Sequence, residues 1–221
     1  MMNVYGLILS YALIFLVIGI STSLQSKGIL KEEGSRKLIH IGVSNWWIIA
    51  MIFFEGENAI WFAMIPPITF IFLNYLSYRL NLLKAMERQE KDSLGTVYFP
   101  ISLLILVIIT YVILGREYAY IGGIGVLIMG YGDGLAAVIG TTYGKHKLPN
   151  GKSIEGSLAM FFSSFIVASI LLYISSISGF IYYALGVAFI ATLIEYFTPH
   201  GFDNLTVPLG SSLVYYLLSL I

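Results

Sequence analysis

Residues 156–194 read GSLAMFFSSFIVASILLYISSISGFIYYALGVAFIATLI, a run without a single Lys, Arg, Asp or Glu. One helical crossing of a bilayer needs about 20 apolar residues, so this run is long enough for two crossings. The polar segment SSISG at 175–179 lies at its middle and is typical of a turn. The stretch therefore predicts two membrane-spanning helices joined by a short connection.

Similar runs occur along the rest of the chain. Charge-free stretches cover residues 3–26, 38–54, 58–78, 93–115 and 204–221, and residues 118–144 contain one acid, Asp133. The chain is 58% hydrophobic and 11% charged, whereas a soluble domain carries about 25% charged residues. We predict an all-α polytopic membrane bundle of about eight transmembrane helices, forming a single domain over residues 1–221. A β-barrel is disfavoured, because its strands would alternate polar and apolar residues.

The charges exclude some functions and orient the chain. Lys and Arg balance Asp and Glu, so bulk electrostatics gives no support to nucleic-acid binding. The absence of Cys excludes disulfides, thiolate metal sites and cysteine nucleophiles. Every Lys and Arg except Arg116 falls within residues 27–37, 79–91 or 145–152, which the eight-helix topology places on one side. By the positive-inside rule, we predict an integral membrane protein whose active site faces the cytoplasm.

Several polar residues lie where a membrane interior should exclude them: His40, Asp133, Glu195, His200, Asp203 and Asn204. The predicted topology places them all near the cytoplasmic ends of their helices, beside the basic loops. Carboxylates bind Mg²⁺, and Lys and Arg bind phosphate oxygens, so this layer suits a metal-bound polyphosphate. The alternative is that basic residues only mark topology and contact anionic headgroups. We favour that alternative for Lys27, Lys31, Lys84 and Arg88.

Asp133 lies in the segment GYGDG at residues 130–134. Glycines around the acid thin the helix and allow another backbone or a phosphate to approach. An acid within a span favours a functional role. The alternative is that the outer glycines form a packing face and Asp133 makes an interhelical hydrogen bond. Helical spacing places three small residues on the same face as the acid: Ala137, Gly140 and Gly144.

The basic loop that follows this span, residues 144–157, reads GKHKLPNGKSIEGS. Gly-Lys-Ser at 151–153 resembles part of a P-loop, but that motif requires a glycine where this chain has His146. The loop still combines flexible glycines, three Lys and a Ser near a helix start, where N–H groups favour anions. It is therefore a candidate phosphate cradle. Helix capping alone would explain Ser153 equally well.

Residues 200–208, which read HGFDNLTVP, connect the last two predicted spans. Asp203 and Asn204 are residue types that favour turns. Together with Glu195 they could equally complete a metal or nucleotide site. Both interpretations stay open at this point.

These stretches together resemble the CTP-dependent lipid-alcohol kinase family, which includes dolichol kinase, phytol kinase and a CTP-dependent diacylglycerol kinase. The resemblance covers about residues 35–208 and rests on RKLIH at 36–40, GDGLAA at 132–137, the loop at 145–157 and DNLTVP at 203–208. It implies transfer of the γ-phosphate of CTP to the hydroxyl of a membrane lipid alcohol, giving a lipid phosphate and CDP. The acceptor would be a polyprenol, dolichol, phytol or diacylglycerol, and Mg²⁺ or another divalent cation would be the cofactor.

The resemblance and the charge pattern together assign roles to individual residues. The candidate catalytic residues are Arg36, Lys37 and Asp133. The candidate nucleotide-binding residues are Gly140, Gly144, Lys145, His146, Lys147, Gly151, Lys152, Ser153, Glu155 and Asn204. The candidate metal ligands are Asp133, Asp203 and Glu195.

Two other functions compete with the kinase interpretation. A CDP-lipid synthase would transfer the cytidylyl group of CTP instead, although this chain lacks the long second acidic motif of those enzymes. An ion-coupled transporter would line an ion path with Asp133 and Glu195. Transporters of that kind show inverted halves with paired broken helices, and no such symmetry is evident in this sequence.

Overall fold

A computed structural model describes residues 1–80, 94–199 and 201–221 of the chain. Within these ranges the chain forms helices and no β-strand, as predicted. The elements are α1 (Met2–Ser26), α2 (Glu32–Ser44), α3 (Trp46–Phe53), α4 (Ala59–Leu80), α5 (Gly95–Ile108), η1 (Ile109–Ile113), η2 (Arg116–Tyr118), α6 (Ala119–Leu127), η3 (Ile128–Asp133), α7 (Gly134–Thr142), α8 (Ile154–Ile174), α9 (Phe180–Phe197) and α10 (Asp203–Leu218). Six helical segments in the described ranges are long and apolar enough to cross a membrane. The all-α polytopic bundle is therefore confirmed.

The other two predicted spans are helical but do not form long unbroken helices. The run at 38–54 is divided at Asn45 into α2 and α3, because the Asn45 side-chain amide donates to the carbonyls of Ile41 at 2.7 Å and Gly42 at 3.4 Å. Such bonds compete with the helical ladder. The run at 204–221 contributes α10, which has 16 residues. The count of eight crossings stays a prediction.

The turn predicted at residues 175–179 joins α8 to α9. Ser176 and Gly179 adopt left-handed backbone angles, with φ of 58° and 68°. This conformation reverses the chain, and α8 and α9 then pack side by side. The prediction of two helices within one charge-free run is confirmed.

The segment that carries Asp133 forms the centre of the bundle. In the most apolar stretch of this segment, 78% of the residues are buried. In the corresponding stretches of the other five long apolar segments, the buried share is 22–44%. Its glycines allow neighbours to approach closely: a Cβ on Gly122 would lie 2.3 Å from Trp47, and one on Gly125 would lie 2.0 Å from the Pro208 carbonyl oxygen. Asp133 is thus held by the most enclosed element of the protein.

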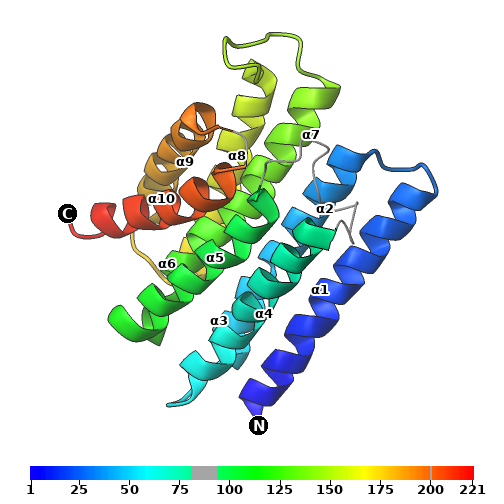
Figure 1. The fold of residues 1–221 in the computed structure, drawn as a ribbon. Helices are drawn as coiled ribbons and strands as arrows, with labels where there is room; N and C mark the ends of the chain where they lie inside the picture. Colours follow the sequence, from blue (N-terminus) through cyan, green and yellow to red (C-terminus); the bar gives the residue numbers. More distant parts are fainter. Residues whose placement is uncertain (81–93, 200) are drawn as a thin grey trace.

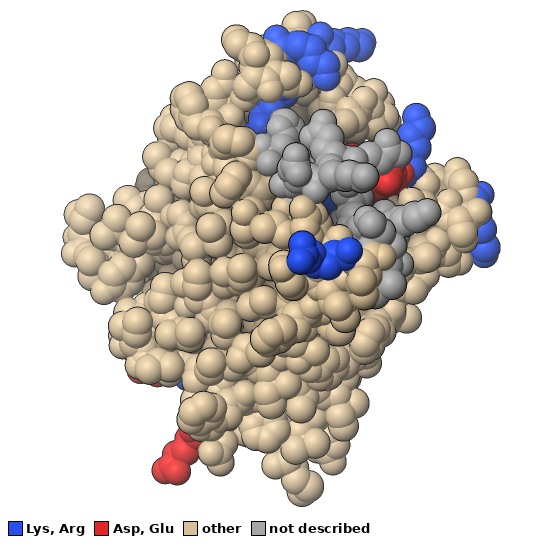
Figure 2. All heavy atoms as spheres, in the orientation of Figure 1, with Lys and Arg blue, Asp and Glu red and all other residues tan. Residues whose placement is uncertain are grey.

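Two of the basic segments, residues 27–37 and 145–152, lie at one end of the bundle (Figure 1). Figure 1 shows that the loop between α7 and α8 and the connection from α1 to α2 lie at the same end, opposite the N-terminus. In the same orientation, Figure 2 shows Lys and Arg concentrated toward this end, while most of the remaining visible surface carries no charge. Lys84, Arg88 and His200 lie outside the described residues.

Candidate active site

A polar pocket opens at the basic end of the bundle, between α2, α7, α8, the end of α9 and the start of α10. It is lined by Glu33, Lys37, Asp133, Ala136, Ala137, Gly140, Thr141, Lys147, Gly151, Lys152, Ser153, Gly156, Ser157, Glu195 and Asp203. The structure therefore brings together the three predicted metal ligands with Lys37 and with part of the predicted nucleotide loop. Ala137 and Gly140 line the pocket with Asp133, as their helical spacing predicts.

The centre of the pocket is a buried ion pair between α2 and η3. Lys37 Nζ donates to Asp133 Oδ2, and the two side chains are 3% and 5% exposed. Asp133 ends the π-helical segment η3, and such segments occur often at functional sites. Pairing lets two charges stay inside an apolar bundle, where either charge alone would be costly.

The glycines beside Asp133 also serve packing. A Cβ on Gly130 would lie 2.1 Å from Ser44 Oγ, and one on Gly134 would lie 2.7 Å from Ile41 Cγ1. These close approaches bring α2 against η3 and so bring Lys37 to Asp133. The packing interpretation and the interhelical bond considered from the sequence are both present, and together they build the charged centre.

A second ion pair connects the basic loop to α9. Lys152 Nζ lies 2.7 Å from Glu195 Oε1 and also donates to the Glu195 carbonyl oxygen. Asn150 Nδ2 donates to the Tyr196 carbonyl oxygen at 2.8 Å. These donors reach the C-terminal end of α9, where carbonyl groups favour cationic and N–H partners. The loop is thereby held against the end of α9, where Lys152 and Glu195 both line the pocket.

Ser153 is the N-cap of α8, and its Oγ accepts from the Gly156 backbone N–H at 3.1 Å. The capping interpretation of Ser153 is thus correct, and Ser153 also lines the pocket. A Cβ on Gly140 would lie 3.1 Å from Ser153 Oγ, and one on Gly144 would lie 2.6 Å from it. Both glycines therefore let the end of α7 pack against the start of α8.

The remaining loop residues differ in their position. Lys147 lines the pocket, and its Nζ donates to the Gly140 carbonyl oxygen at 3.3 Å. His146 instead pairs with Glu155 at 2.7 Å, and neither side chain lines the pocket. Lys145 is exposed and lies outside the pocket lining as well. A nucleotide-binding role for His146, Glu155 and Lys145 stays a prediction that this geometry does not support directly.

Asp203 and Asn204 begin α10 and form a local turn. Asp203 Oδ1 accepts from the backbone N–H groups of Gly201 at 3.1 Å and Asn204 at 2.9 Å. The turn interpretation is therefore correct. Asp203 also lines the pocket, and its role as a metal ligand stays a prediction. Asn204 is 1% exposed, and its Oδ1 has no hydrogen-bond partner among the described residues. It is a buried acceptor beside the pocket wall.

Arg36 is placed differently from its neighbour Lys37. Its side chain is 8% exposed, and its guanidinium pairs with Glu33 one turn earlier on α2. Arg36 does not line the pocket, whereas Glu33 does. Glu33 and Thr141 are pocket residues that the sequence analysis missed, whereas Ser157 belongs to the loop at 144–157 that it indicated. The separation of four between Glu33 and Lys37 could have indicated Glu33, because it places both on one helix face.

The carboxylates fit a metal ion only in combination with a ligand. In the part of the chain that the structure describes, no three His, Cys, Asp or Glu side chains are grouped closely enough to hold a metal by themselves. Asp133 and Glu195 each have a Lys partner. Mg²⁺, however, commonly uses one or two carboxylates together with substrate phosphates. The donor set on this pocket wall fits that mode of binding.

Comparison with known proteins identifies relatives over most of the chain. It is 34% identical to phytol kinase from Synechocystis sp. over 192 residues, which cover 82% of this chain and 78% of that protein. It is 30% identical to phytol kinase 1, chloroplastic, from Arabidopsis thaliana over 234 residues, with coverages of 96% and 72%. It is 31% identical to probable phytol kinase 1, chloroplastic, from Oryza sativa over 221 residues, with coverages of 88% and 67%. No protein-family model and no solved structure matches the chain.

Proposed function

The chain belongs to the lipid-alcohol kinase family that includes phytol kinase, and we propose that it transfers the γ-phosphate of CTP to the hydroxyl of a membrane lipid alcohol. The alcohol oxygen forms a bond to the γ-phosphorus, and the bond from that phosphorus to the β,γ-bridging oxygen breaks. The hydroxyl proton is released. The products are a lipid phosphate and CDP, so atoms and charge balance without a further reactant.

The observation that carries this proposal is the charged pocket at one end of an otherwise apolar helix bundle. Lys37, Lys147 and Lys152 line it together with carboxylates. Phosphoryl transfer depends mainly on positioning and on stabilisation of charge. Ammonium groups at fixed positions would contact the phosphate oxygens and stabilise the charge that develops during transfer.

Asp133 and Asp203, which line the pocket from different elements, would hold a divalent cation. When bound, such a cation would neutralise part of the negative charge of the phosphates. Lys37 lies within hydrogen-bonding distance of Asp133, so its ammonium group would reach the same phosphate. Glu195 holds Lys152, and through that residue it fixes the loop at the pocket mouth.

The acceptor would reach this layer from within the membrane. The bundle surface outside the pocket is mainly apolar, so a lipid alcohol can keep its chain among the helices and bring its hydroxyl to the basic end. The nucleotide would enter from the aqueous side, where the loop between α7 and α8 projects (Figure 1).

The test is a donor and acceptor panel on the purified protein in lipid nanodiscs. CTP, ATP, GTP and UTP labelled at the γ position are each incubated with phytol, a polyprenol, dolichol and diacylglycerol, with and without Mg²⁺. We expect labelled lipid phosphate with CTP in the presence of the metal and with at least one of these alcohols. Absence of labelled lipid with every pair, under conditions where an established phytol kinase is active, would contradict the proposal.

A further inference from the structure

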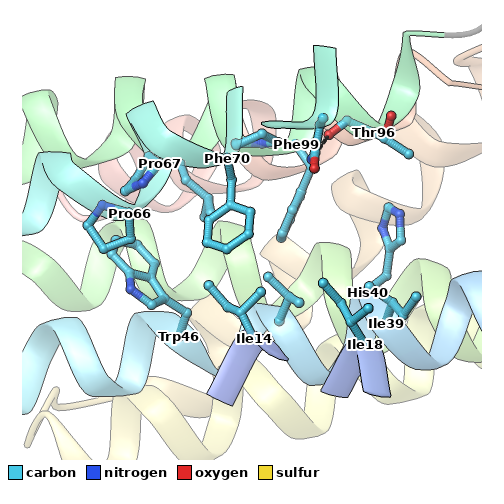
Figure 3. Close-up of a pocket in the computed structure, with 14 residues that line it drawn as sticks. Ile14, Ile18, Ile39, His40, Trp46, Pro66, Pro67, Phe70, Thr96 and Phe99 are labelled. Atoms are coloured by element: carbon cyan, nitrogen blue, oxygen red, sulfur yellow. Dashed lines mark hydrogen bonds between the residues drawn. The ribbon is translucent and has the colours of Figure 1, made fainter. Parts of the chain in front are cut away.

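A second cavity lies beside the polar pocket, between α1, α2, α4 and α5 (Figure 3). Its walls are apolar side chains such as Ile18, Val43, Phe70 and Leu103. The two cavities share α2 as a common wall, with Lys37 in the polar pocket and His40 in the apolar cavity. One turn of helix therefore separates the charged centre from an apolar space.

Prolines shape the apolar cavity. Pro66 and Pro67 in α4 and Pro100 in α5 all line it. A proline within a helix lacks the N–H that would bond the carbonyl four residues earlier, so it bends the helix. In α5 that carbonyl belongs to Thr96, and it accepts instead from Asn74 Nδ2 at 2.7 Å. The polar groups of Asn74 and Thr96 thus satisfy one another, and most of the remaining lining is apolar.

His40 lies at the end of the cavity nearest the polar pocket. Its ring packs on the Phe99 ring, with 5.5 Å between centroids, and faces the cavity (Figure 3). On the other side of α2, a Cβ on Gly130 would lie 3.2 Å from the His40 carbonyl oxygen. His40 is therefore on the turn of α2 that packs directly on η3, the segment that ends at Asp133.

We propose that this cavity holds the hydrocarbon chain next to the hydroxyl of the acceptor alcohol, and that His40 hydrogen-bonds the hydroxyl. The inference rests on the proposed function and deepens it. His40 follows Lys37 by three residues on α2, an axial rise of about 4.5 Å. An amphiphile with its chain in the apolar cavity and its oxygen at His40 would therefore lie next to the turn that carries Lys37 of the Lys37–Asp133 pair. The two adjoining cavities thus match the two ends of a lipid alcohol.

Selection by this cavity depends on shape. A lipid chain is already in an apolar medium when it lies in the bilayer, so transfer into an apolar cavity gains little from hydrophobicity alone. Discrimination among alcohols then comes from how branches and double bonds near the hydroxyl fit between α2 and the proline-containing helices α4 and α5. Substitutions that fill the cavity should change acceptor preference and leave the nucleotide requirement unchanged.

The first experiment compares Val43→Phe with Val112→Phe. Val43 lines the cavity, whereas Val112 is 61% exposed on the outer surface of η1, so the same substitution there is the matched control. For Val43→Phe we expect the KM for the alcohol that the wild type accepts to rise at least tenfold with the KM for CTP unchanged, and we expect wild-type values for the control. Ile18→Phe against the exposed Ile20→Phe repeats the comparison from α1.

The second experiment tests His40 through two substitutions. His40→Phe keeps a ring against Phe99 and removes the polar atoms, so kcat/KM for the alcohol should fall at least tenfold while CTP binding stays unchanged. His40→Gln restores a polar end and should recover part of that loss. A purely structural role would lower CTP binding together with alcohol turnover, and wild-type kcat/KM in His40→Phe would overturn the assignment of His40.

A third measurement needs no variant. A phytol analogue with a diazirine a few carbons from the hydroxyl should crosslink in the wild-type protein to residues 66–74 or 96–103. Crosslinks confined to other segments would overturn the assignment of the cavity. Lack of turnover of any alcohol by the wild type would instead count against the proposed function. Turnover with equal acceptor kinetics in Val43→Phe and Val112→Phe would overturn only this inference.

Discussion

Lys37 on α2 and Asp133 at the end of η3, 96 residues apart in the sequence, form a buried ion pair at the wall of the polar pocket. The pair is neutral as a unit, which allows it to lie within an apolar bundle. Each charge depends on the other, so substitution of one residue affects both stability and the proposed chemistry. The two effects can be separated experimentally.

Asp133→Asn should lower phosphotransferase turnover by about 10²-fold or more, because it removes the proposed metal and phosphate-orienting charge. It should also destabilise the protein, since loss of one partner of a buried ion pair typically costs about 3–5 kcal/mol. Turnover and thermal unfolding in detergent measure the two effects. Near-wild-type turnover in this variant would remove Asp133 from the mechanism.

The double variant Lys37→Met with Asp133→Leu separates folding from catalysis. Replacement of a buried ion pair by apolar residues of similar volume is often neutral or stabilising. We therefore expect its melting temperature to return toward that of the wild type while turnover stays absent. Recovery of activity together with stability would show that the pair is only structural.

The loop lysines should differ in their effect on CTP. Lys147 and Lys152 line the pocket, whereas Lys145 is exposed outside it. Loss of one charge-assisted contact costs on the order of 1.5–3 kcal/mol, about tenfold to a hundredfold in binding. Lys147→Gln and Lys152→Gln should raise the KM for CTP by that factor, with the KM for lipid less affected, and Lys145→Gln should have a smaller effect.

Lys27→Gln is the control for this series, because Lys27 is exposed in the loop between α1 and α2. It is one of the basic residues for which we favour a role in topology alone. Lys152→Gln also removes the partner of Glu195, so Lys147→Gln is the cleaner test of phosphate binding. Unchanged CTP kinetics in all four variants would mean that the nucleotide binds elsewhere.

Gly130→Ala should loosen the contact between α2 and η3. The added Cβ would lie 2.1 Å from Ser44 Oγ, and such overpacking usually costs about 1–3 kcal/mol. We expect a lower melting temperature and lower turnover, with partial recovery when Ser44→Gly is added. Gly19→Ala in α1 is the matched control, because nothing lies within 4 Å of its added Cβ. Equal melting temperatures for the two alanine variants would contradict this account of the packing.

Single cysteines can test the orientation, because the chain contains no Cys of its own. Ser26 at the end of α1 and Glu57 between α3 and α4 are both exposed, on opposite sides of the predicted topology. In intact cells, a membrane-impermeant maleimide should label Glu57→Cys and should label Ser26→Cys only after permeabilisation. The opposite pattern would place the polar pocket outside the cell.

Much of the fold could be predicted because long charge-free runs leave a membrane chain few alternatives. The break at Asn45 could not be predicted, because it depends on a side-chain amide that bonds its own helix and on Tyr131, whose hydroxyl bonds to Asn45 Oδ1 at 3.0 Å. That second contact joins residues far apart in the sequence. A local sequence pattern does not contain information about such a long-range contact.

The candidate site also has features that the sequence predicts and features that depend on the packing of distant residues. Asp133 stands out in the sequence as an acid within an apolar span, which favours a functional role. In the structure it lines the pocket. Its pairing with Lys37, and the turning of Arg36 toward Glu33, depend on how α2 packs against η3. Neighbouring basic residues on one helix look alike in sequence. Only the packing shows that Lys37 lines the pocket and Arg36 does not.

The most direct test of the central claim follows the phosphorus atoms of CTP. Parallel reactions contain CTP labelled at the γ position or at the α position, with purified protein in nanodiscs and an accepted lipid alcohol. The account predicts label in the lipid product from γ-labelled CTP only, with CDP released in equal amount. Label in the lipid from α-labelled CTP, with release of pyrophosphate, would contradict it and establish cytidylyl transfer instead.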